Sequence, residues 1–223
     1  MKPIAAAYNG VRARVGELTG TLDETTSGTP VPPCPRWTVH DVVAHLVGVV
    51  EDAMAGRLDG VATDPWTQAQ VDARREHSIP EMLVAWSEAA PPFEGMLDEI
   101  GPVGRQVVLD AVTHEHDIRT ALGEPGARQS DAVIIGYEFG APVFLEEAEG
   151  HGARIRLVGV GVQAYGPSDA VRLEGSPFDL MRALTGRRSV EQIRAMAWSG
   201  ECEPVLEMFT WGPFRPSAVA IDE

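Results

Sequence analysis

Apolar residues recur at helical spacing through the first 125 residues. From residue 3 to residue 18 they fall at Ile4, Ala7, Val11 and Val15, which predicts an amphipathic helix. The same spacing predicts further helices over 39–53, 66–77 and 105–122. One more helix is expected to begin at Pro80. Four main helices among these segments, in up-down order, predict a four-helix bundle.

Local signals mark several helix ends. Thr38, followed three residues later by Asp41, resembles a capping box and predicts a helix start. Gly123 is expected to stop the helix over 105–122. Residues 20–35 are rich in Thr, Gly and Pro, so we expect a long loop there.

The helix that begins at Pro80 contains two adjacent prolines. Proline lacks the amide hydrogen that an interior helical position donates, and its ring clashes with the preceding turn. We therefore expect Pro91 and Pro92 to break or kink this helix, which then resumes as far as Ile100.

The pattern changes near residue 130. Residues 130–148 still have helical spacing, but polar and apolar residues then alternate, which is typical of strands. Strands are expected at 154–160, 170–174 and 195–198, and short helices at 178–184, 190–194 and 203–209. This mixture predicts a small C-terminal α+β domain after the all-α N-terminal bundle.

Three segments follow from this change in pattern. We expect a metal-binding four-helix bundle over 1–125, a connecting helix over 126–149 and a small α+β domain over 150–223.

Composition and charge narrow the classes of function. The 223 residues are 44% hydrophobic and 23% charged, which is typical of a globular protein. A net charge of −15 disfavours binding to nucleic acid or to an anionic membrane surface. Two cysteines, Cys34 and Cys202, with no CxxC motif do not form a disulfide framework, so we expect a cytoplasmic protein.

A candidate metal site comes from two helices. Asp110 and His114 are four residues apart, so they share one helix face and can reach the same ion. His45 lies on the apolar face of a second helix. Two histidines and a carboxylate are a common ligand set for zinc with one open position, and the same set can hold Fe(II). The alternative is a core histidine and an ordinary Asp–His ion pair, with Asp117 as a further hydrogen-bond partner.

Arginine pairs are candidate sites for a substrate carboxylate. Arg74 and Arg75 are adjacent, and Arg188 follows another arginine. A guanidinium group matches a carboxylate in geometry and charge. The alternative is that these arginines belong to a solvated surface.

Two segments resemble a known family. Residues 34–46 read CPRWTVHDVVAHL, and residues 110–123 read DAVTHEHDIRTALG. The first resembles the second-helix signature of the mycothiol-dependent maleylpyruvate isomerase family, which belongs to the DinB-like metal-binding four-helix bundles. The second resembles the Glu-x-x-x-His-x-x-Asp motif of that family, with Asp110 in place of the longer glutamate.

The resemblance implies a ligand set and a chemistry. The metal ligands would be His45, Asp110 and His114, with Asp117 orienting a ligand, and the C-terminal domain would resemble sterol-carrier folds. Zinc, or another divalent metal, would activate the thiol of mycothiol, which then attacks a small electrophile. The expected function is therefore a mycothiol-dependent isomerase or S-transferase, whose partners are this low-molecular-weight thiol and a small-molecule substrate.

Two alternatives stay open. The chain could be a DinB-like metal-binding protein without catalysis, or a carrier that holds a small hydrophobic ligand in its C-terminal domain. Metal content separates the carrier from the other two functions, and thiol-dependent turnover separates the enzyme from the non-catalytic metal protein.

Overall fold

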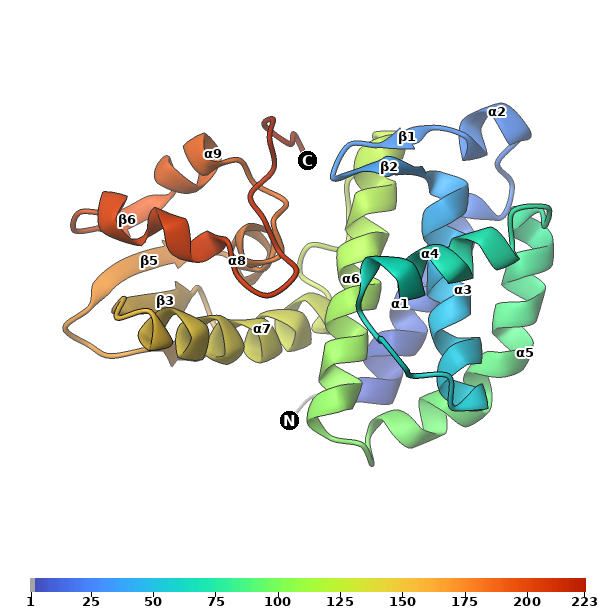
Figure 1. Ribbon diagram of the computed structural model, residues 1–223, viewed down its shortest axis with the longest axis horizontal. Coiled ribbons are helices and arrows are strands. Elements are labelled where there is room, and N and C mark those ends of the chain that lie inside the picture. The colour runs from blue at the N-terminus through green and yellow to red at the C-terminus, as the bar shows by residue number, and fades with distance from the viewer. Residues whose placement is uncertain (1–2) are drawn as a thin grey trace. The chain divides into compact units, whose positions relative to one another are not determined.

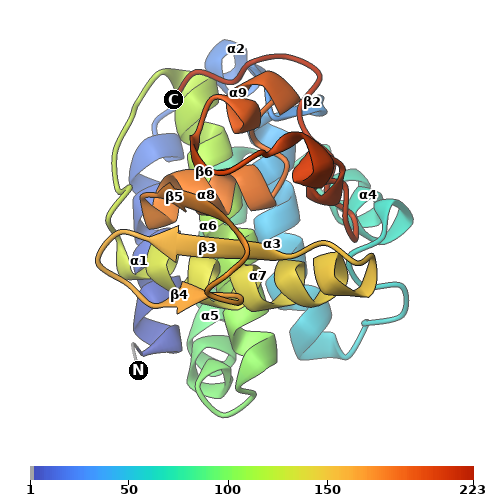
Figure 2. The ribbon, with the colours of Figure 1, turned by 90° about the vertical axis from the view of Figure 1, so that its left-hand side faces the viewer.

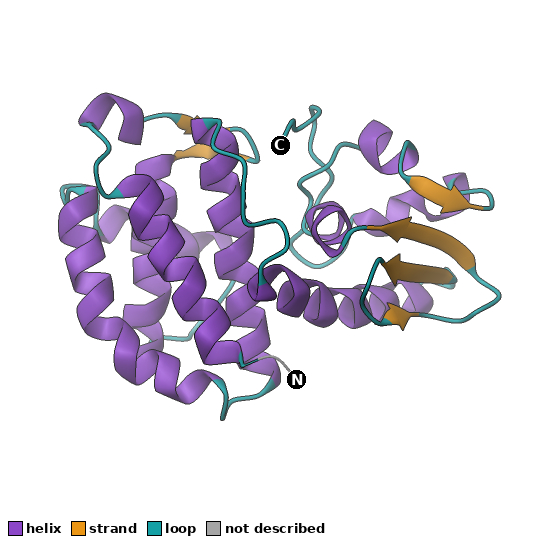
Figure 3. Ribbon diagram, turned by 180° about the vertical axis from the view of Figure 1, so that it is seen from behind, coloured by secondary structure: helices purple, strands orange, loops and turns teal. Residues whose placement is uncertain are grey.

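The computed structural model describes residues 3–223, so Met1 and Lys2 lie outside the described residues. The chain divides into two compact units, residues 1–126 with Glu223 and residues 127–222. Figure 3 shows that the first unit is helical apart from a short hairpin, whereas the larger sheet belongs to the second unit. The protein is thus mostly helical, with an N-terminal helical part and a small C-terminal sheet region, as the sequence predicts.

Four long helices pack together in the first unit (Figure 1). They are α1 (Ile4–Thr19), α3 (Val39–Ala55), α5 (Ile79–Leu97) and α6 (Pro102–Leu122). Helix α1 contacts α5 and α6, and α3 contacts the same two helices. The shorter α4 (Asp64–Ala73) packs against α3. Through these contacts α3, α4 and α6 surround the candidate ligands.

The predicted loop over 20–35 contains regular structure. It holds a short helix, α2 (Glu24–Ser27), and the two strands of a hairpin, β1 (Pro30–Val31) and β2 (Cys34–Thr38). Thr38 then caps α3 by accepting a hydrogen bond from the Asp41 amide, while the Asp41 side chain accepts one from the Thr38 amide. This capping box confirms the predicted start of α3.

A break or a kink is predicted at the two prolines of α5, and the helix does not break there. The helix runs continuously through Pro91 and Pro92. The carbonyls four residues earlier belong to Ser87 and Glu88, which are exposed, so water can bind the carbonyls that proline leaves without a donor. Packing also holds the helix together, because it buries apolar side chains both before and after the prolines.

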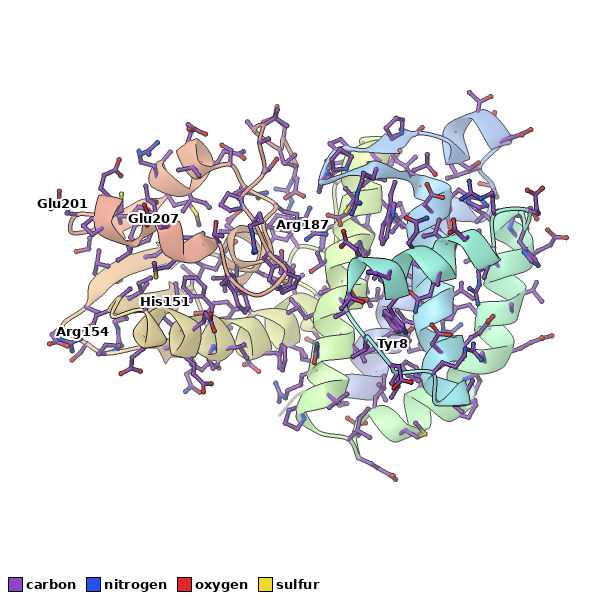
Figure 4. The ribbon with its side chains drawn as sticks, in the orientation of Figure 1. Tyr8, His151, Arg154, Arg187, Glu201 and Glu207 are labelled. Atoms are coloured by element: carbon purple, nitrogen blue, oxygen red, sulfur yellow. The ribbon has the colours of Figure 1, made fainter. Side chains whose placement is uncertain are left out.

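Aromatic side chains fill the interior between α1 and α5. Tyr8 contacts Trp86 and Phe93 edge to face, with ring centroids 6.4 and 5.4 Å away. The Trp86 indole donates a hydrogen bond of 3.2 Å to the Tyr8 hydroxyl, and Figure 4 shows Tyr8 inside the helical unit. Burial raises the pKa of Tyr8 well above its usual range. Its hydroxyl therefore stays protonated and has a structural role.

The second unit contains a mixed four-stranded sheet in the order β4-β3-β5-β6 (Figure 2). The strands are β3 (Ile155–Gly159), β4 (Ala164–Tyr165), β5 (Val171–Gly175) and β6 (Ala197–Ser199). Strands β3 and β5 are parallel, and each has an antiparallel partner at the edge. The remaining elements are α8 (Pro177–Leu184), α9 (Val190–Arg194) and a 3-10 helix, η1 (Glu203–Phe209).

Helix α7 (Asp131–Gly150) belongs to this second unit. The sequence suggests a connecting helix over 126–149, but α7 packs against α8 and contacts β3 and β4. Its Phe144 is fully buried against Phe209 and Trp211. Because it covers the sheet and supplies core residues, α7 is part of the second unit and not a linker. None of the helices described, α7 included, is long and apolar enough to cross a bilayer.

Candidate metal centre

The three predicted ligands meet between α3 and α6. His45 Nε2 lies 3.4 Å from Asp110 Oδ2, and His114 Nε2 lies 3.7 Å from Asp110 Oδ1. One ligand atom from each side chain lies within 4.8 Å of the others. The helical spacing of Asp110 and His114 and the packing of α3 on α6 together produce this cluster.

This geometry fits a zinc ion. Ligand atoms bound tetrahedrally at about 2.0–2.2 Å are separated from one another by roughly 3.4 Å. The distances from Asp110 to the two imidazoles are close to that separation. Side-chain exposure is 3% for His45, 9% for His114 and 39% for Asp110, so the cluster is open to solvent on the side of the carboxylate.

The second nitrogen of His45 contacts a glutamine that the sequence analysis missed. His45 Nδ1 lies 2.7 Å from Gln70 Oε1, and Gln70 is buried on α4. The Gln70 amide nitrogen donates a hydrogen bond of 2.8 Å to Asp52 Oδ2. Asp52 in turn accepts one from the exposed Arg57. A polar chain therefore extends from the imidazole towards the surface.

The second nitrogen of His114 faces a carboxylate on the same helix. His114 Nδ1 lies 3.0 Å from Asp117 Oδ2, but the pair does not form an aligned hydrogen bond. The Cys34 thiol donates to the same oxygen over 3.5 Å. Cys34, His114 and Asp117 thus form a second cluster of close ligand atoms, which shares His114 with the first.

A buried ion pair fixes α6 behind these ligands. Glu115 is fully buried and accepts two hydrogen bonds from Arg14 of α1, at 2.8 and 2.7 Å. Arg119, one turn further along α6, donates a third at 3.0 Å. A buried carboxylate with several charged donors is costly to displace, so these contacts restrain the rotation of α6.

Aromatic rings lie beside both imidazoles. The Trp37 ring, from β2, is centred 5.2 Å from the His45 ring and 5.7 Å from the His114 ring. Trp66 of α4 makes an edge contact with His45 at 6.4 Å. The hairpin and α4 therefore add apolar surface to the centre. The sequence does not predict that Trp37 of the hairpin or Trp66 of α4 lies at the site.

The candidate arginines do not join this cluster. Arg74 is 8% exposed and pairs with Glu51, so it is not the surface residue that its sequence context suggests. Arg75 is exposed and pairs with Asp72. Arg188 belongs to the second unit, where it lies 3.5 Å from Asp179 and over the ring of Phe178. Each of these guanidinium groups is engaged by an acidic residue of its own unit.

Comparison with known proteins identifies the family. The family model of the mycothiol maleylpyruvate isomerase N-terminal domain matches residues 9–132, which is more than half of the chain. The chain belongs to this family. The matched range includes His45, Asp110 and His114, so all three predicted ligands lie within the family domain.

Two solved structures share the fold. One is the mycothiol-dependent maleylpyruvate isomerase, with a TM-score of 0.55 and 12% identity over 82% of this chain and 88% of that chain. The other is a histidine-to-alanine mutant of a protein with the same description, with a TM-score of 0.58 and 11% identity over 88% and 91%. No curated protein matches the chain.

Proposed function

We propose that this protein is a metal-dependent enzyme that uses mycothiol to isomerise a small electrophile or to transfer the thiol to it. The observation that carries the proposal is the meeting of His45, Asp110 and His114 inside a domain of the mycothiol maleylpyruvate isomerase family. Two imidazoles and one carboxylate leave a coordination position open, which a catalytic metal needs.

In this proposal His45, Asp110 and His114 hold the metal, with zinc the best match to the ligand set. Zinc there would act as a Lewis acid and favour the thiolate form of the cofactor. Asp110 is one methylene shorter than the glutamate of the family motif, yet its two oxygens already face both imidazoles. Its partial exposure makes it the side from which a thiol approaches.

The neighbouring residues orient the ligands. Asp117 faces the outer nitrogen of His114, while Trp37 covers both imidazole rings. The chain's own thiol, Cys34, lies against Asp117 at the outer nitrogen of His114. The ligand atoms Nε2 of both histidines face Asp110 instead. This placement favours a nucleophilic thiol that comes from solution.

The reaction would follow from addition of the thiolate to a conjugated double bond. Addition forms a carbon–sulfur bond and moves the electron pair of the double bond onto the conjugated carbonyl as an enolate, so the former double bond becomes single and rotates. When the enolate collapses, it restores the double bond in the other geometry, breaks the carbon–sulfur bond and releases the thiolate. If the enolate carbon takes up a proton instead, the thioether is the product, and the enzyme is a transferase.

The finer assignment of the two domains is part of the same proposal. Residues 1–125 would be a DinB-like metal-binding bundle, and the second unit, residues 127–222, a sterol-carrier-like domain that includes α7. Arg75 and Arg188 remain candidates for binding a substrate carboxylate, although each already contacts an acidic side chain. Arg74 is the weakest candidate, because it is buried against Glu51.

The two alternative functions receive different support. The ligand cluster is equally compatible with a metal-binding protein without catalysis. A carrier of a hydrophobic ligand has less support from the described part of the second unit. A hollow of about 370 Å³ there is lined by three ionisable side chains, Glu147, His151 and Glu207, and by Ala148, Met208 and Thr210. Figure 4 labels His151 and Glu207. Covering the three ionisable groups with an apolar ligand would cost free energy, although the hollow also offers apolar surface.

Metal analysis combined with a thiol assay tests the proposal. We expect about one zinc per chain, loss of thiol-dependent turnover after chelation, and recovery when zinc is restored. The assay follows consumption of mycothiol and isomerisation of conjugated acids. Full activity of the metal-free protein would contradict the mechanism, and bound zinc without any thiol-dependent turnover would favour the non-catalytic alternative.

A further inference from the structure

A polar chain runs along one face of α3 on the side away from Asp110. His45, Gly48 and Asp52 are spaced three and four residues apart, so they share a face of this helix. His45 and Asp52 are separated by about 10 Å along the helix axis. The side chain of Gln70, from α4, spans this interval, accepting from His45 at one end and donating to Asp52 at the other.

The direction of the Gln70 amide follows from its partners. An ionised carboxylate only accepts hydrogen bonds, so the amide nitrogen of Gln70 must face Asp52. The amide oxygen therefore faces His45, and an oxygen can only accept there. His45 Nδ1 must then carry a hydrogen, and in the neutral ring this leaves Nε2 with a lone pair on the side of Asp110.

We propose that Gln70 is a positioning residue that holds His45 in the tautomer with an unprotonated Nε2, ready to bind a metal. The tautomer assignment rests on the hydrogen bonds alone, and its consequence for metal binding rests on the proposed function. Asp52 accepts a hydrogen bond from the Gln70 amide nitrogen and so fixes the orientation of the amide. The amide oxygen then accepts a hydrogen bond from His45 Nδ1 and fixes the tautomer of His45. We call the chain Asp52–Gln70–His45 the relay.

Gly48 is the packing feature that permits this arrangement. A Cβ added at Gly48 would lie 2.5 Å from Cβ and 2.6 Å from Cγ of Gln70, which is closer than side-chain atoms approach one another. Any larger residue would push the Gln70 stem away from α3. The close approach of α4 to α3 therefore depends on a glycine one turn after His45.

A neutral partner for His45 also limits the negative charge at the centre. Asp110 and Asp117 already face the two histidines, and Asp52 lies beyond Gln70. An amide orients the ring without adding another charge, so His45 is the less strongly polarised ligand. Gln70 thus fixes the orientation of the His45 ring without making His45 a stronger electron donor to a bound metal.

The first test uses the metal-free protein and does not depend on activity. We would record long-range ¹H–¹⁵N spectra of histidine-labelled protein over a series of pH values and compare the neutral form of His45 in each variant. In the wild type His45 should be a single tautomer with hydrogen on Nδ1. In Gln70→Leu it should become a mixture or carry the hydrogen on Nε2, because no acceptor remains at Nδ1.

The second test measures zinc affinity by competition with a chelating dye. Gln70→Leu should weaken zinc binding by about 10–100-fold, the usual effect of losing a partner of a ligating histidine. Gln70→Glu should lose less zinc affinity than Gln70→Leu, because a carboxyl oxygen still faces Nδ1. It should not match the wild type, because its second oxygen replaces the amide donor to Asp52. Gln68→Leu is the matched control, since Gln68 is exposed on the same helix and bonds only to Asp72 among the contacts described.

Gly48→Ala is a second variant that should disturb the hydrogen bond between Gln70 and His45. Its added methyl displaces the Gln70 stem without changing either polar partner, so it should reproduce both effects of Gln70→Leu. If Gln70→Leu does not fold, as judged by circular dichroism, Gly48→Ala and Gln70→Glu carry the test.

Two results would overturn the inference. One is hydrogen on Nε2 of His45 in the metal-free wild type, and the other is an unchanged tautomer and zinc affinity in both Gln70→Leu and Gly48→Ala. These outcomes are distinct from failure of the proposed function. A wild type that binds no zinc, but whose His45 tautomer depends on Gln70, would refute the metal site and support the relay.

Discussion

The two histidines of the candidate centre are held by different means. His45 makes a well-formed hydrogen bond of 2.7 Å to Gln70, a neutral residue on another helix. His114 lies 3.0 Å from Asp117, a charged residue one turn further along its own helix, without the alignment of a hydrogen bond. The first imidazole is therefore oriented by a hydrogen bond, whereas the second lies beside a negative charge.

This difference separates local from tertiary control of a ligand. The spacing of His114 and Asp117 brings them together in any α-helix, so the contact needs no other part of the fold. The contact of His45 with Gln70 exists only because α4 packs against α3. An anionic partner also makes an imidazole a stronger donor than a neutral one does. The two histidines should thus differ in how they respond to substitution.

The largest expected effect comes from removing either imidazole. His45→Ala and His114→Ala each delete one of three protein ligands. Loss of a residue that only hydrogen-bonds to a ligand lowers metal affinity by up to about 100-fold, so zinc affinity should fall by more than that in these variants. Zinc stoichiometry and thiol-dependent turnover should disappear together in both variants. Wild-type zinc affinity in either one would remove the proposed site, and loss in only one would show that the two ligands are not equivalent.

A smaller loss is expected when the charge beside His114 is removed. Asp117→Asn keeps an oxygen near Nδ1 but withdraws the negative charge, so zinc affinity should fall by about 10–100-fold. Because Asp117 is fully buried, thermal unfolding should be measured on the same samples. An Asp117→Asn protein with unchanged zinc affinity and unchanged stability would contradict the view that charge, and not alignment, holds His114.

The thiol beside Asp117 should matter less. Cys34→Ser retains a donor to the same carboxylate oxygen, and a hydroxyl donates more strongly than a thiol does. Zinc affinity and thiol-dependent turnover should change by less than about tenfold. Abolition of metal binding by Cys34→Ser would instead identify the sulfur as a ligand and assign the metal to the second cluster around His114.

The smallest effect concerns His40, which shares α3 with His45 but points elsewhere. Its Nε2 donates to the backbone oxygen of His77, so His40→Ala should retain zinc fully and serve as a control for His45→Ala. The Asp41 carboxylate, whose Oδ1 lies 3.8 Å from His40 Nδ1, raises the pKa of His40 above its usual value and outweighs the opposing effect of burial. Loss of zinc in this variant would point to a general disturbance of α3.

The contribution of His40 to the free energy of unfolding should decrease as pH rises. Because the folded pKa of His40 is raised, its charged form stabilises the native state below pH 6.5, and this contribution is lost as pH rises through the folded value. The wild type should exceed His40→Ala in free energy of unfolding by up to about 1 kcal/mol in mild acid and by less above neutrality. Urea unfolding at both pH values measures the difference, and a gap that widens with pH would contradict the assignment.

Helical periodicity predicted much of the first unit, because apolar residues recur at helical spacing in the segments that form α1, α3 and α6. At α5 the two prolines predict a break or a kink, and the helix does not break, because buried side chains on both sides of the prolines hold it against its neighbours. The sequence pattern missed the hairpin of β1 and β2. A two-residue strand that pairs across a turn has too little alternation to be recognised in sequence.

The sequence by itself determined the elements that depend on neighbouring residues: the helices, the cap at Thr38 and the face shared by Asp110, His114 and Asp117. These follow from a backbone whose geometry repeats every few residues. Only the tertiary structure decided which side chains meet across helices. His45 reaches Asp110 because α3 packs on α6, and Gln70 reaches His45 because Gly48 lets α4 come close. Such contacts depend on the distance and rotation between separate helices, which no spacing within one helix encodes.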